Sequence, residues 1–407
     1  MKELDREAHD ADAADPLASF RDLFAGAETE LVYFDGNSLG RPLAATAGTL
    51  SDFVRDAWGG RLIRGWDESW MQLPFTLGDR LGASVLGAAA GQTVVGDSTT
   101  VLLYKLVRAA FDAQRAADPA RREIVVDRDN FPTDRYIVEA IAGERSGAVR
   151  WLTPDPAGGV EPDELSAAIG SETAVVVLSH VAYRSGHLAD AAELTRRAHA
   201  AGALVVWDLC HSAGVVPTEL DAWGVDIAVG CTYKYLGGGP GSPAFAYVAT
   251  RHHEALHQPI PGWMSADDVF AMGADYRPAA GMRRFLSGTP PIVGMLALGD
   301  MLDIIERAWI AAIRAKSEAL TAFAVRVSDV LLAPLGVSLA TPREPERRGG
   351  HVTLSHPAMR EVTTRLWRED VLPDFRFPDG LRIGLSPLST SFRETLTGLR
   401  AVADALR

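Results

Sequence analysis

Two segments place ionisable side chains directly after apolar, strand-like stretches. The first is the β-branched run Leu204–Trp207, which Asp208 follows and which has His211 three residues later. The second ends in Lys234, just before the glycine run 237–239. In open α/β sheets, ligands bind beyond the carboxyl ends of the strands. We therefore expect a carboxylate, an imidazole and an amine at one ligand-binding edge.

This combination suits pyridoxal phosphate. That cofactor needs a lysine that forms a Schiff base, and a carboxylate that keeps the pyridine nitrogen protonated so that the ring accepts electrons. Each residue alone has a simpler interpretation, because a strand-end aspartate often caps a loop or helix and a lysine in a glycine-rich loop is often solvated. The glycine run is no P-loop, since the lysine precedes the glycines. The two residues occur together, with Asp208 about one strand–helix unit before Lys234, and this joint pattern favours the cofactor.

Composition limits the class of protein. The chain has 407 residues, 47% of them hydrophobic and 23% charged, as in soluble globular proteins. A net charge of −13 argues against nucleic-acid binding, which depends on clustered lysine and arginine. The polar, acidic start predicts no secretory signal, and no apolar run is long enough for a membrane span. Two cysteines, Cys210 and Cys231, provide no disulfide framework, so we expect a cytoplasmic location.

Short β-branched runs alternate with helical patterns through the middle of the chain, which predicts a mainly parallel sheet between helices. Past Pro290 the pattern changes to long helices and then to short strands and helices, typical of an α+β unit. We predict an N-terminal segment (1–44), polar apart from one helix at Pro16–Phe24 and packed on a small domain. A large α/β domain (45–295) and a small C-terminal α+β domain (296–407) follow. His252, His253 and His257 are interpreted as a solvated helical face, with no metal site.

Several motifs in order resemble the kynureninase family, fold-type-I pyridoxal-phosphate enzymes of the class-V aminotransferase group. The resemblance runs through most of the chain. Besides the two segments above, the matching stretches are Tyr33–Gly40, Leu62–Trp66, Asp97–Thr100, Asn130–Asp134, Gly262-Trp263, Gly288–Ile292 and Leu381–Gly384.

The resemblance implies a role for individual residues. Lys234 would be the Schiff-base lysine and proton shuttle, Asp208 the partner of the pyridine nitrogen, and Tyr233 a general acid. Arg382 would grip the substrate α-carboxylate, a task that suits a bidentate guanidinium. The remaining residues implied to contact the cofactor are His211, Phe131, Thr99, Thr100, Asp134, Ser185, Trp263 and Thr289, and those implied to contact substrate are Asn37 and Ser38.

The implied reaction is hydrolysis of the Cβ–Cγ bond of kynurenine or a ring-substituted kynurenine, which gives alanine and an anthranilate-type acid. The family also implies a homodimer with shared active sites, because Trp263 and Thr289 reach across the interface in related enzymes. The substrate is then a small amino acid, with neither nucleic acid nor membrane as a partner.

Four positions on the substrate side depart from the family pattern: Leu102, Ala182, Ser389 and the loop Met264–Asp268. These changes leave a second hypothesis open, a lyase, desulfurase or epimerase of the same type that acts on another, non-aryl amino acid in secondary metabolism. A third hypothesis, a catalytically idle scaffold, conflicts with the presence of Lys234 and Asp208.

Overall fold

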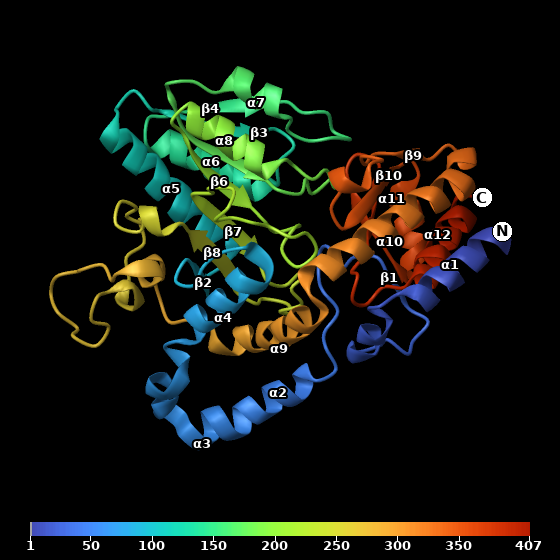
Figure 1. The fold of residues 1–407 in the computed structure, drawn as a ribbon, viewed down its shortest axis with the longest axis horizontal. Helices are drawn as coiled ribbons and strands as arrows, with labels where there is room; N and C mark the ends of the chain where they lie inside the picture. Colours follow the sequence, from blue (N-terminus) through green and yellow to red (C-terminus); the bar gives the residue numbers. More distant parts are fainter. Residues whose placement is uncertain (1) are drawn as a thin grey trace.

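A seven-stranded, mainly parallel sheet forms the centre of the molecule (Figure 1). The structure, a computed structural model, describes residues 2–407. Strand order is β2-β8-β7-β6-β5-β3-β4, and β8 runs antiparallel to both of its neighbours. The strands are β2 (Thr93–Gly96), β3 (Glu123–Asp127), β4 (Ala148–Leu152), β5 (Thr173–Ser179), β6 (Leu204–Asp208), β7 (Ile227–Cys231) and β8 (Ala244–Val248).

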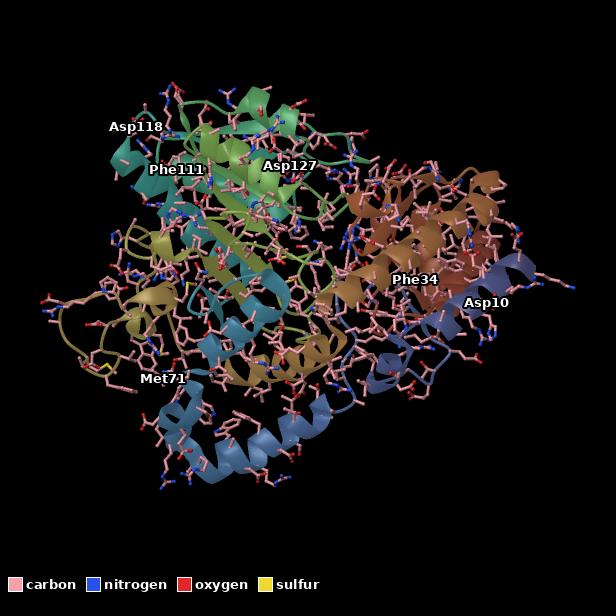
Figure 2. The ribbon with its side chains drawn as sticks, in the orientation of Figure 1. Asp10, Phe34, Met71, Phe111, Asp118 and Asp127 are labelled. Carbon is pink, nitrogen blue, oxygen red and sulfur yellow. The ribbon has the colours of Figure 1, made fainter. Side chains whose placement is uncertain are left out.

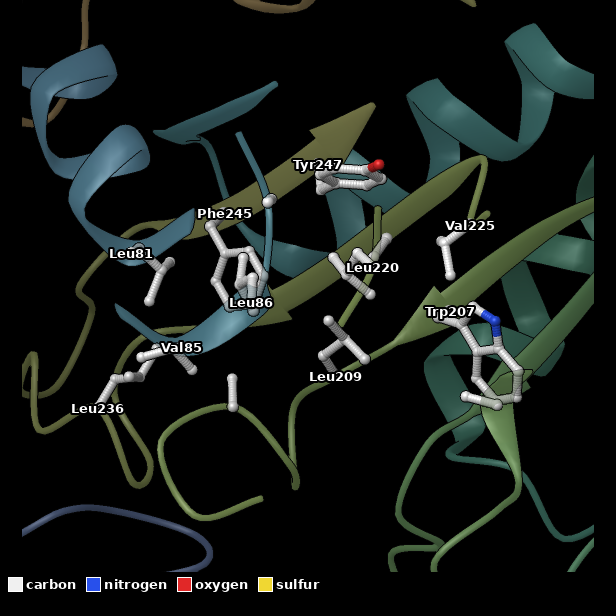
Figure 3. Close-up of a cluster of buried hydrophobic side chains, with 14 of the residues drawn as sticks. Leu81, Val85, Leu86, Trp207, Leu209, Leu220, Val225, Leu236, Phe245 and Tyr247 are labelled. Carbon is white, nitrogen blue, oxygen red and sulfur yellow. The ribbon is translucent and has the colours of Figure 1, made fainter. Parts of the chain in front are cut away.

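Side chains along each strand alternate between the two faces of this sheet, and each face packs into its own hydrophobic core. Val205 and Trp207 of β6 belong to one cluster of buried residues, whereas Val206 belongs to the other. Period-two alternation of this kind follows from the pleat of a strand. Figure 3 shows part of the first cluster, with Trp207 of β6 beside Val225 and with Phe245 and Tyr247 of β8 farther along the sheet. Because both faces are covered, β6 presents polar atoms only beyond its carboxyl end.

Helices on both faces supply the rest of the two cores. The second cluster contains the helices α5 (Thr99–Ala117) and α6 (Pro132–Glu144), and the first contains α4 (Leu73–Leu81), α7 (Pro162–Ala168), α8 (Ala191–Ala200) and α9 (Ile292–Ala308). Helix α5 begins where Ser98 caps it, since the Ser98 side chain accepts a hydrogen bond from the N–H of Val101. The N-terminus of α5 lies at the edge of the sheet where β6 ends, since Thr99 is close to Cys210.

The C-terminal region forms a second, smaller layer of helices and strands. Its antiparallel sheet has the order β12-β13-β10-β9, and β1 pairs in parallel with β11. The elements are α10 (Ile310–Leu331), β9 (Ser338–Leu339), β10 (His351–Ser355), α11 (Met359–Trp367), β11 (Val371–Leu372), β12 (Asp374–Arg376), β13 (Gly380–Gly384) and α12 (Phe392–Leu406), together with β1 (Val32–Tyr33).

The start of the chain is folded into that C-terminal layer. Residues 2–14 form helix α1 (Lys2–Ala14), which lies beside α12 in Figure 1, and the stretch around 16–24 is only a 3-10 helix, Ala18–Leu23. The prediction of a polar lead with one helix at Pro16–Phe24 was therefore wrong. Helix α1 is mostly charged, and only Leu4 and Ala8 are buried, so its apolar stripe is too narrow to stand out before α12 is in place.

Buried residues suggest where the smaller unit begins. Phe34, fully buried among C-terminal residues, is visible in that part of Figure 2. Helix α9 packs with the large sheet, whereas α10 from Leu320 onward packs with β10 and β13. The division into 1–44, 45–295 and 296–407 stays a prediction, and we infer from α9 that the C-terminal unit starts within α10.

The histidines near residue 252 have partners that the sequence did not suggest. His252 ends a 3-10 turn and its ring lies 2.7 Å from Asp226, a buried carboxylate that His199 also contacts at 2.8 Å. His253 is buried against a backbone carbonyl. The interpretation as a solvated face was wrong for His252 and His253, because their partners include Asp226 from a segment 26 residues earlier and a backbone carbonyl, whereas His257 is exposed. Across residues 2–407, three or more potential metal ligands do not gather anywhere, and none of the helices is both long and apolar enough to span a membrane.

The arm between the first segment and the sheet contains α2 (Thr46–Asp52) and α3 (Gly59–Arg61), joined by a π-helical turn. Figure 1 shows this arm at the margin of the molecule. It is tied to α9 by hydrogen bonds from Thr46 and Thr49 to Asp300. Several large apolar side chains of the arm remain exposed in the single chain: Val54, Trp58, Leu62 and Ile63.

Candidate active site

Lys234 lies buried beyond the end of β7, next to an imidazole from the neighbouring strand end. Its Nζ is 3.2 Å from Nε2 of His211, which follows β6. Burial, and then the nearby Lys234 amine, hold the pKa of His211 well below its usual value. The ring is therefore neutral, and Nε2 accepts from the lysine while Nδ1 carries the proton. The Lys234 amine is therefore buried and hydrogen-bonded to a neutral acceptor.

Two carboxyl groups lie together beside this amine. Asp208, 5% exposed, ends β6 and accepts a hydrogen bond from the N–H of Cys210 at 2.8 Å. Asp134, in the first turn of α6, is 2% exposed and its Oδ2 has no partner within the described chain. Burial raises the pKa of Asp134 well above its usual value, and the neighbouring Asp208 raises it further. Both effects favour the protonated form of the Asp134 carboxyl group over its ionised form.

Aromatic rings and a helix terminus complete this region. The Lys234 Nζ lies 5.8 Å from the ring centroids of both Phe131 and Tyr233. Phe131 is 37% exposed, so one face of its ring is open to a ligand. Burial raises the pKa of the Tyr233 phenol, which therefore keeps its proton at neutral pH. Thr99 begins α5 and its hydroxyl is 4.0 Å from Cys210 Sγ, so the positive end of α5 faces this region with the exposed Thr100.

The loop at 35–40 closes over the backbone of the lysine. The N–H of Gly40 donates to the carbonyl of Tyr233 at 2.8 Å. A Cβ at Gly40 would lie 2.3 Å from the Lys234 carbonyl oxygen, so only glycine allows this approach. Asn37 in the same loop is fully buried, and both of its amide atoms lack a partner in residues 2–407. The loop brings Asn37 and Ser38 to the site from the N-terminal segment.

Arg382 of β13 is 1% exposed and faces that loop. Its guanidinium donates to Ser38 Oγ at 2.8 Å and to the carbonyl of Tyr183 at 2.8 Å. Tyr183 in turn packs edge-on against Phe131, with ring centroids 5.4 Å apart. A chain of contacts thus joins the arginine to the lysine, through Tyr183 and Phe131.

Three of the residues predicted to bind the cofactor are placed differently. Ser185 donates to the carbonyl of Gly158 and accepts from the N–H of His187, so its hydroxyl is already engaged. Trp263 packs edge-on against Phe270, and Thr289 is exposed. Within the described part of one chain, neither Trp263 nor Thr289 joins the contacts around Lys234.

Sequence reasoning missed two residues of this region. His351 of β10 is fully buried, its ring lies 6.0 Å from that of His211, and neither ring nitrogen has a partner in the described residues. Asp374, partly buried, forms an ion pair with the buried Arg382. A signal for Asp374 existed, because the Pro-Asp-Gly turn at 378–380 predicts a hairpin that pairs residue 374 with residue 382. His351 had no comparable signal.

The donors and acceptors present fit pyridoxal phosphate. An amine, an acid pair with one unpartnered oxygen on Asp134, and an open aromatic face on Phe131 match the aldehyde, the pyridine nitrogen and the ring. The N-terminus of α5, with Thr99 and Thr100, offers N–H groups and hydroxyls of the kind that bind phosphate.

Two of the four positions that depart from the family pattern lie in the core. Leu102 and Met264 are both fully buried in the cluster between the sheet and α5. Ala182 lines a small cavity with Asn130 and Tyr183, close to Phe131. Leu102 and Met264 therefore serve packing, Asp267 and Asp268 of the same loop are exposed, Ser389 is buried, and Ala182 is the departure beside the aromatic residues of the site.

His180 lies between the core and the end of β6, and the effect of its burial on stability can be tested. Its N–H donates to the Asp208 carbonyl at 2.9 Å, and its ring packs edge-on against Trp207 and Trp223. Burial, reinforced by Arg314, lowers the pKa of His180 to about 3. Because the unfolded histidine titrates near pH ~6.5, its contribution to stability is complete above that pH and is lost as the pH falls toward 3.

We expect His180→Gln, which has no such titration, to be less stable than the native chain at pH ~7.5, by a margin that shrinks by about 1.4 kcal/mol at pH ~5.5. Urea unfolding of the cofactor-saturated proteins at both pH values measures the margin. An unchanged margin would mean that the His180 ring takes up a proton in the folded state.

Comparisons with known proteins place this site in a family. Residues 83–364 match the aminotransferase class-V family. The kynureninase of Pseudomonas fluorescens is 41% identical over 397 residues, which cover 97% of this chain and 94% of that enzyme. The chain belongs to the kynureninase family. A kynureninase of Burkholderia pseudomallei is likewise 41% identical, over 98% of this chain and 95% of its own length.

Solved structures share the fold at lower identity. The cystine C–S lyase C-DES, in complex with its product cysteine persulfide, superposes with a TM-score of 0.81 at 19% identity, over 94% of this chain and 99% of its own. A cysteine desulfurase of Thermococcus onnurineus gives a TM-score of 0.80, also at 19% identity, over 95% of this chain and 97% of its own. The predicted fold is thus confirmed: the chain has the class-V fold with a mainly parallel sheet.

Proposed function

We propose that the protein is a pyridoxal-phosphate-dependent hydrolase that cleaves the Cβ–Cγ bond of kynurenine or a ring-substituted kynurenine. The products are alanine and an anthranilate-type acid. The observation that carries this proposal is 41% identity over nearly the full length of kynureninases. The buried amine of Lys234 beside the acid pair of Asp208 and Asp134 supports it.

Different residues of the site would bind different parts of the cofactor. Lys234 would bind its aldehyde, Asp208 and Asp134 would serve the pyridine nitrogen, and Phe131 would cover the ring. Thr99 and Thr100, at the start of α5, would hold the phosphate. When bound, the cofactor supplies a carbonyl that takes up the substrate amine and a ring that accepts electrons from the substrate.

Proton transfers fall to Lys234 and Tyr233. Lys234, once free of the aldehyde, takes the proton from the substrate α-carbon, and its neutral neighbour His211 helps by accepting a hydrogen bond. Water adds to the γ-carbonyl, and cleavage of the Cβ–Cγ bond leaves Cβ in need of a proton. The Tyr233 phenol keeps its proton at neutral pH and donates it to that carbon. Arg382 holds the α-carboxylate, with Asn37 and Ser38 nearby.

The alternative, a lyase, desulfurase or epimerase for a non-aryl amino acid, is not favoured. Desulfurases and the cystine lyase share only 17–19% identity with this chain, whereas kynureninases share 41%. Burial of Leu102 and Met264 in the core also gives these two residues a packing role.

We infer a homodimer in which each subunit completes the site of the other. Within the described chain, neither Trp263 nor Thr289 is among the contacts of Lys234, which is expected if they serve the partner's site. The arm at 46–63 exposes Val54, Trp58 and Ile63, an apolar surface that a second copy would cover. The unpaired, buried thiols of Cys210 and Cys231 are consistent with a cytoplasmic location.

Incubation of the cofactor-loaded protein with L-kynurenine tests the proposed function. We expect alanine and a fluorescent anthranilate in equal amounts, measured by mass spectrometry and fluorescence, with 3-hydroxykynurenine giving the hydroxylated acid. Lys234→Ala, loaded in the same way, is the matched control and forms neither product. Release of pyruvate or sulfide from other amino acids, with no aryl acid from either kynurenine, contradicts the proposal.

A further inference from the structure

The two edges of the Arg382 guanidinium are occupied differently. On one edge, Nε donates to Asp374 Oδ2 at 2.9 Å and Nη2 contacts the same oxygen. On the other edge, Nη1 donates to the Tyr183 carbonyl and Nη2 to Ser38 Oγ, both at 2.8 Å. These contacts use four of the five N–H groups of an arginine, so one on Nη1 remains.

Asp374 is held on its edge by the strand pairing. β12 and β13 form an antiparallel hairpin in which Asp374 is the direct cross-strand partner of Arg382. Such partners lie side by side on one face of a sheet. The side chains are 14% and 1% exposed, and Asp374 also contacts Arg376 at 2.9 Å. The ion pair is therefore part of the fold and is shielded from water.

Only the second edge leads toward the reacting groups. Its acceptor Tyr183 packs against Phe131, and Phe131 lies 5.8 Å from the Lys234 amine. Its acceptor Ser38 is a hydroxyl, which can turn to donate once a carboxylate arrives. An α-carboxylate that binds this edge in a bidentate manner takes the place of two uncharged acceptors, Ser38 Oγ and the Tyr183 carbonyl, on the side of the guanidinium that Tyr183 joins to Phe131. One that binds the Nε edge would have to displace Asp374.

We propose that Asp374 is a positioning residue, which occupies the Nε edge of Arg382 and so directs the substrate α-carboxylate to the edge between Tyr183 and Ser38. The inference rests on the proposed function, in which Arg382 holds that carboxylate. Without the Asp374 charge, the Nε edge has no anionic partner, and a carboxylate can bind the guanidinium at either edge.

Asp374→Asn tests this role, because asparagine keeps the shape and one oxygen acceptor but removes the charge. The control is Asp370→Asn, an exposed aspartate of the same region whose positive φ of 55° asparagine tolerates. The affinities of two ligands are read from the absorbance change of the bound cofactor. One ligand is L-kynurenine, and the other is its analogue with hydrogen in place of the α-carboxylate.

We expect Asp374→Asn to weaken binding of L-kynurenine about 10-fold or more, the range for a charge-assisted bidentate contact, and to leave the analogue unchanged. KM rises by a similar factor, whereas kcat changes much less. Asp370→Asn behaves as the native protein. Equal weakening of both ligands, or no weakening of either, overturns the proposal, since the first indicates a purely structural role.

Arg382→Lys separates this inference from the proposed function. If Arg382→Lys binds both ligands as the native protein does, the assignment of Arg382 to the carboxylate fails, and the role of Asp374 fails with it. If Arg382→Lys loses selectivity for the carboxylate but Asp374→Asn keeps it, only the positioning role is overturned. Should Asp374→Asn not fold, Asp374→Glu retains the charge at a shifted oxygen, and its selectivity is expected to be reduced; full native selectivity overturns the role.

Discussion

Lys234→Ala is expected to lower kcat/KM for L-kynurenine by about a thousandfold or more, because one side chain both binds the cofactor and moves the α-proton. Alanine leaves the Nε2 of His211 without its donor but adds no charge to the buried region. The variant should therefore fold and bind the cofactor without a covalent link. Stopped assays of alanine release, together with the loss of the visible absorbance of the lysine-bound cofactor, measure the effect.

The exposed Lys2→Ala variant has the same change in charge and is expected to match the native enzyme. Added small amines test the proton-transfer role, since an external amine in the vacated space can restore part of the rate. A Lys234→Ala enzyme with more than about a tenth of native activity would remove Lys234 from the chemistry.

Asp208→Asn is expected to reduce kcat about 100- to 1,000-fold, the range for loss of one preorganised electrostatic contact. An amide cannot hold the pyridine nitrogen protonated, so the ring accepts electrons poorly. Asparagine still accepts the hydrogen bond from the N–H of Cys210, which preserves the turn after β6. The effect should therefore fall on kcat, measured at saturating substrate, with the melting temperature close to that of the native enzyme.

Asp267→Asn, at an exposed position of the loop after Trp263, provides the matched loss of charge. An analogue of the cofactor that carries a permanent charge on the pyridine nitrogen should restore much of the Asp208→Asn rate. If that analogue has no effect, Asp208 acts through the fold rather than through the ring.

The elements that position Lys234 and Asp208 could be predicted from local pattern. The β-branched run that became β6 was predicted within a residue. Helix α8 (Ala191–Ala200) has the same kind of local signal in the sequence, because Asp190 caps it and its apolar face is regular. These signals depend on neighbours in sequence. The same holds for the start of α5 at Thr99.

Other features depend on contacts between distant segments, which a single sequence does not reveal. Strand β2 was missed because Thr93–Gly96 is only four residues long, and β1 and β11 have two each. His351 became part of the site only because β10 brings it beside His211, 140 residues earlier in the chain. Helix α1 was missed for the same reason, since its stability comes from α12.

The pairing of β1 with β11 has a consequence for biosynthesis. The loop that carries Asn37 and Ser38 follows β1 directly, and Asp35 bridges to Gly384. A nascent chain contains these residues long before β11 and β13, so they find their places only after those two strands have left the ribosome. The large sheet can form earlier, but the substrate-binding loop has to wait for β11 and β13, and termination before residue 371 leaves a polypeptide without its partner strands.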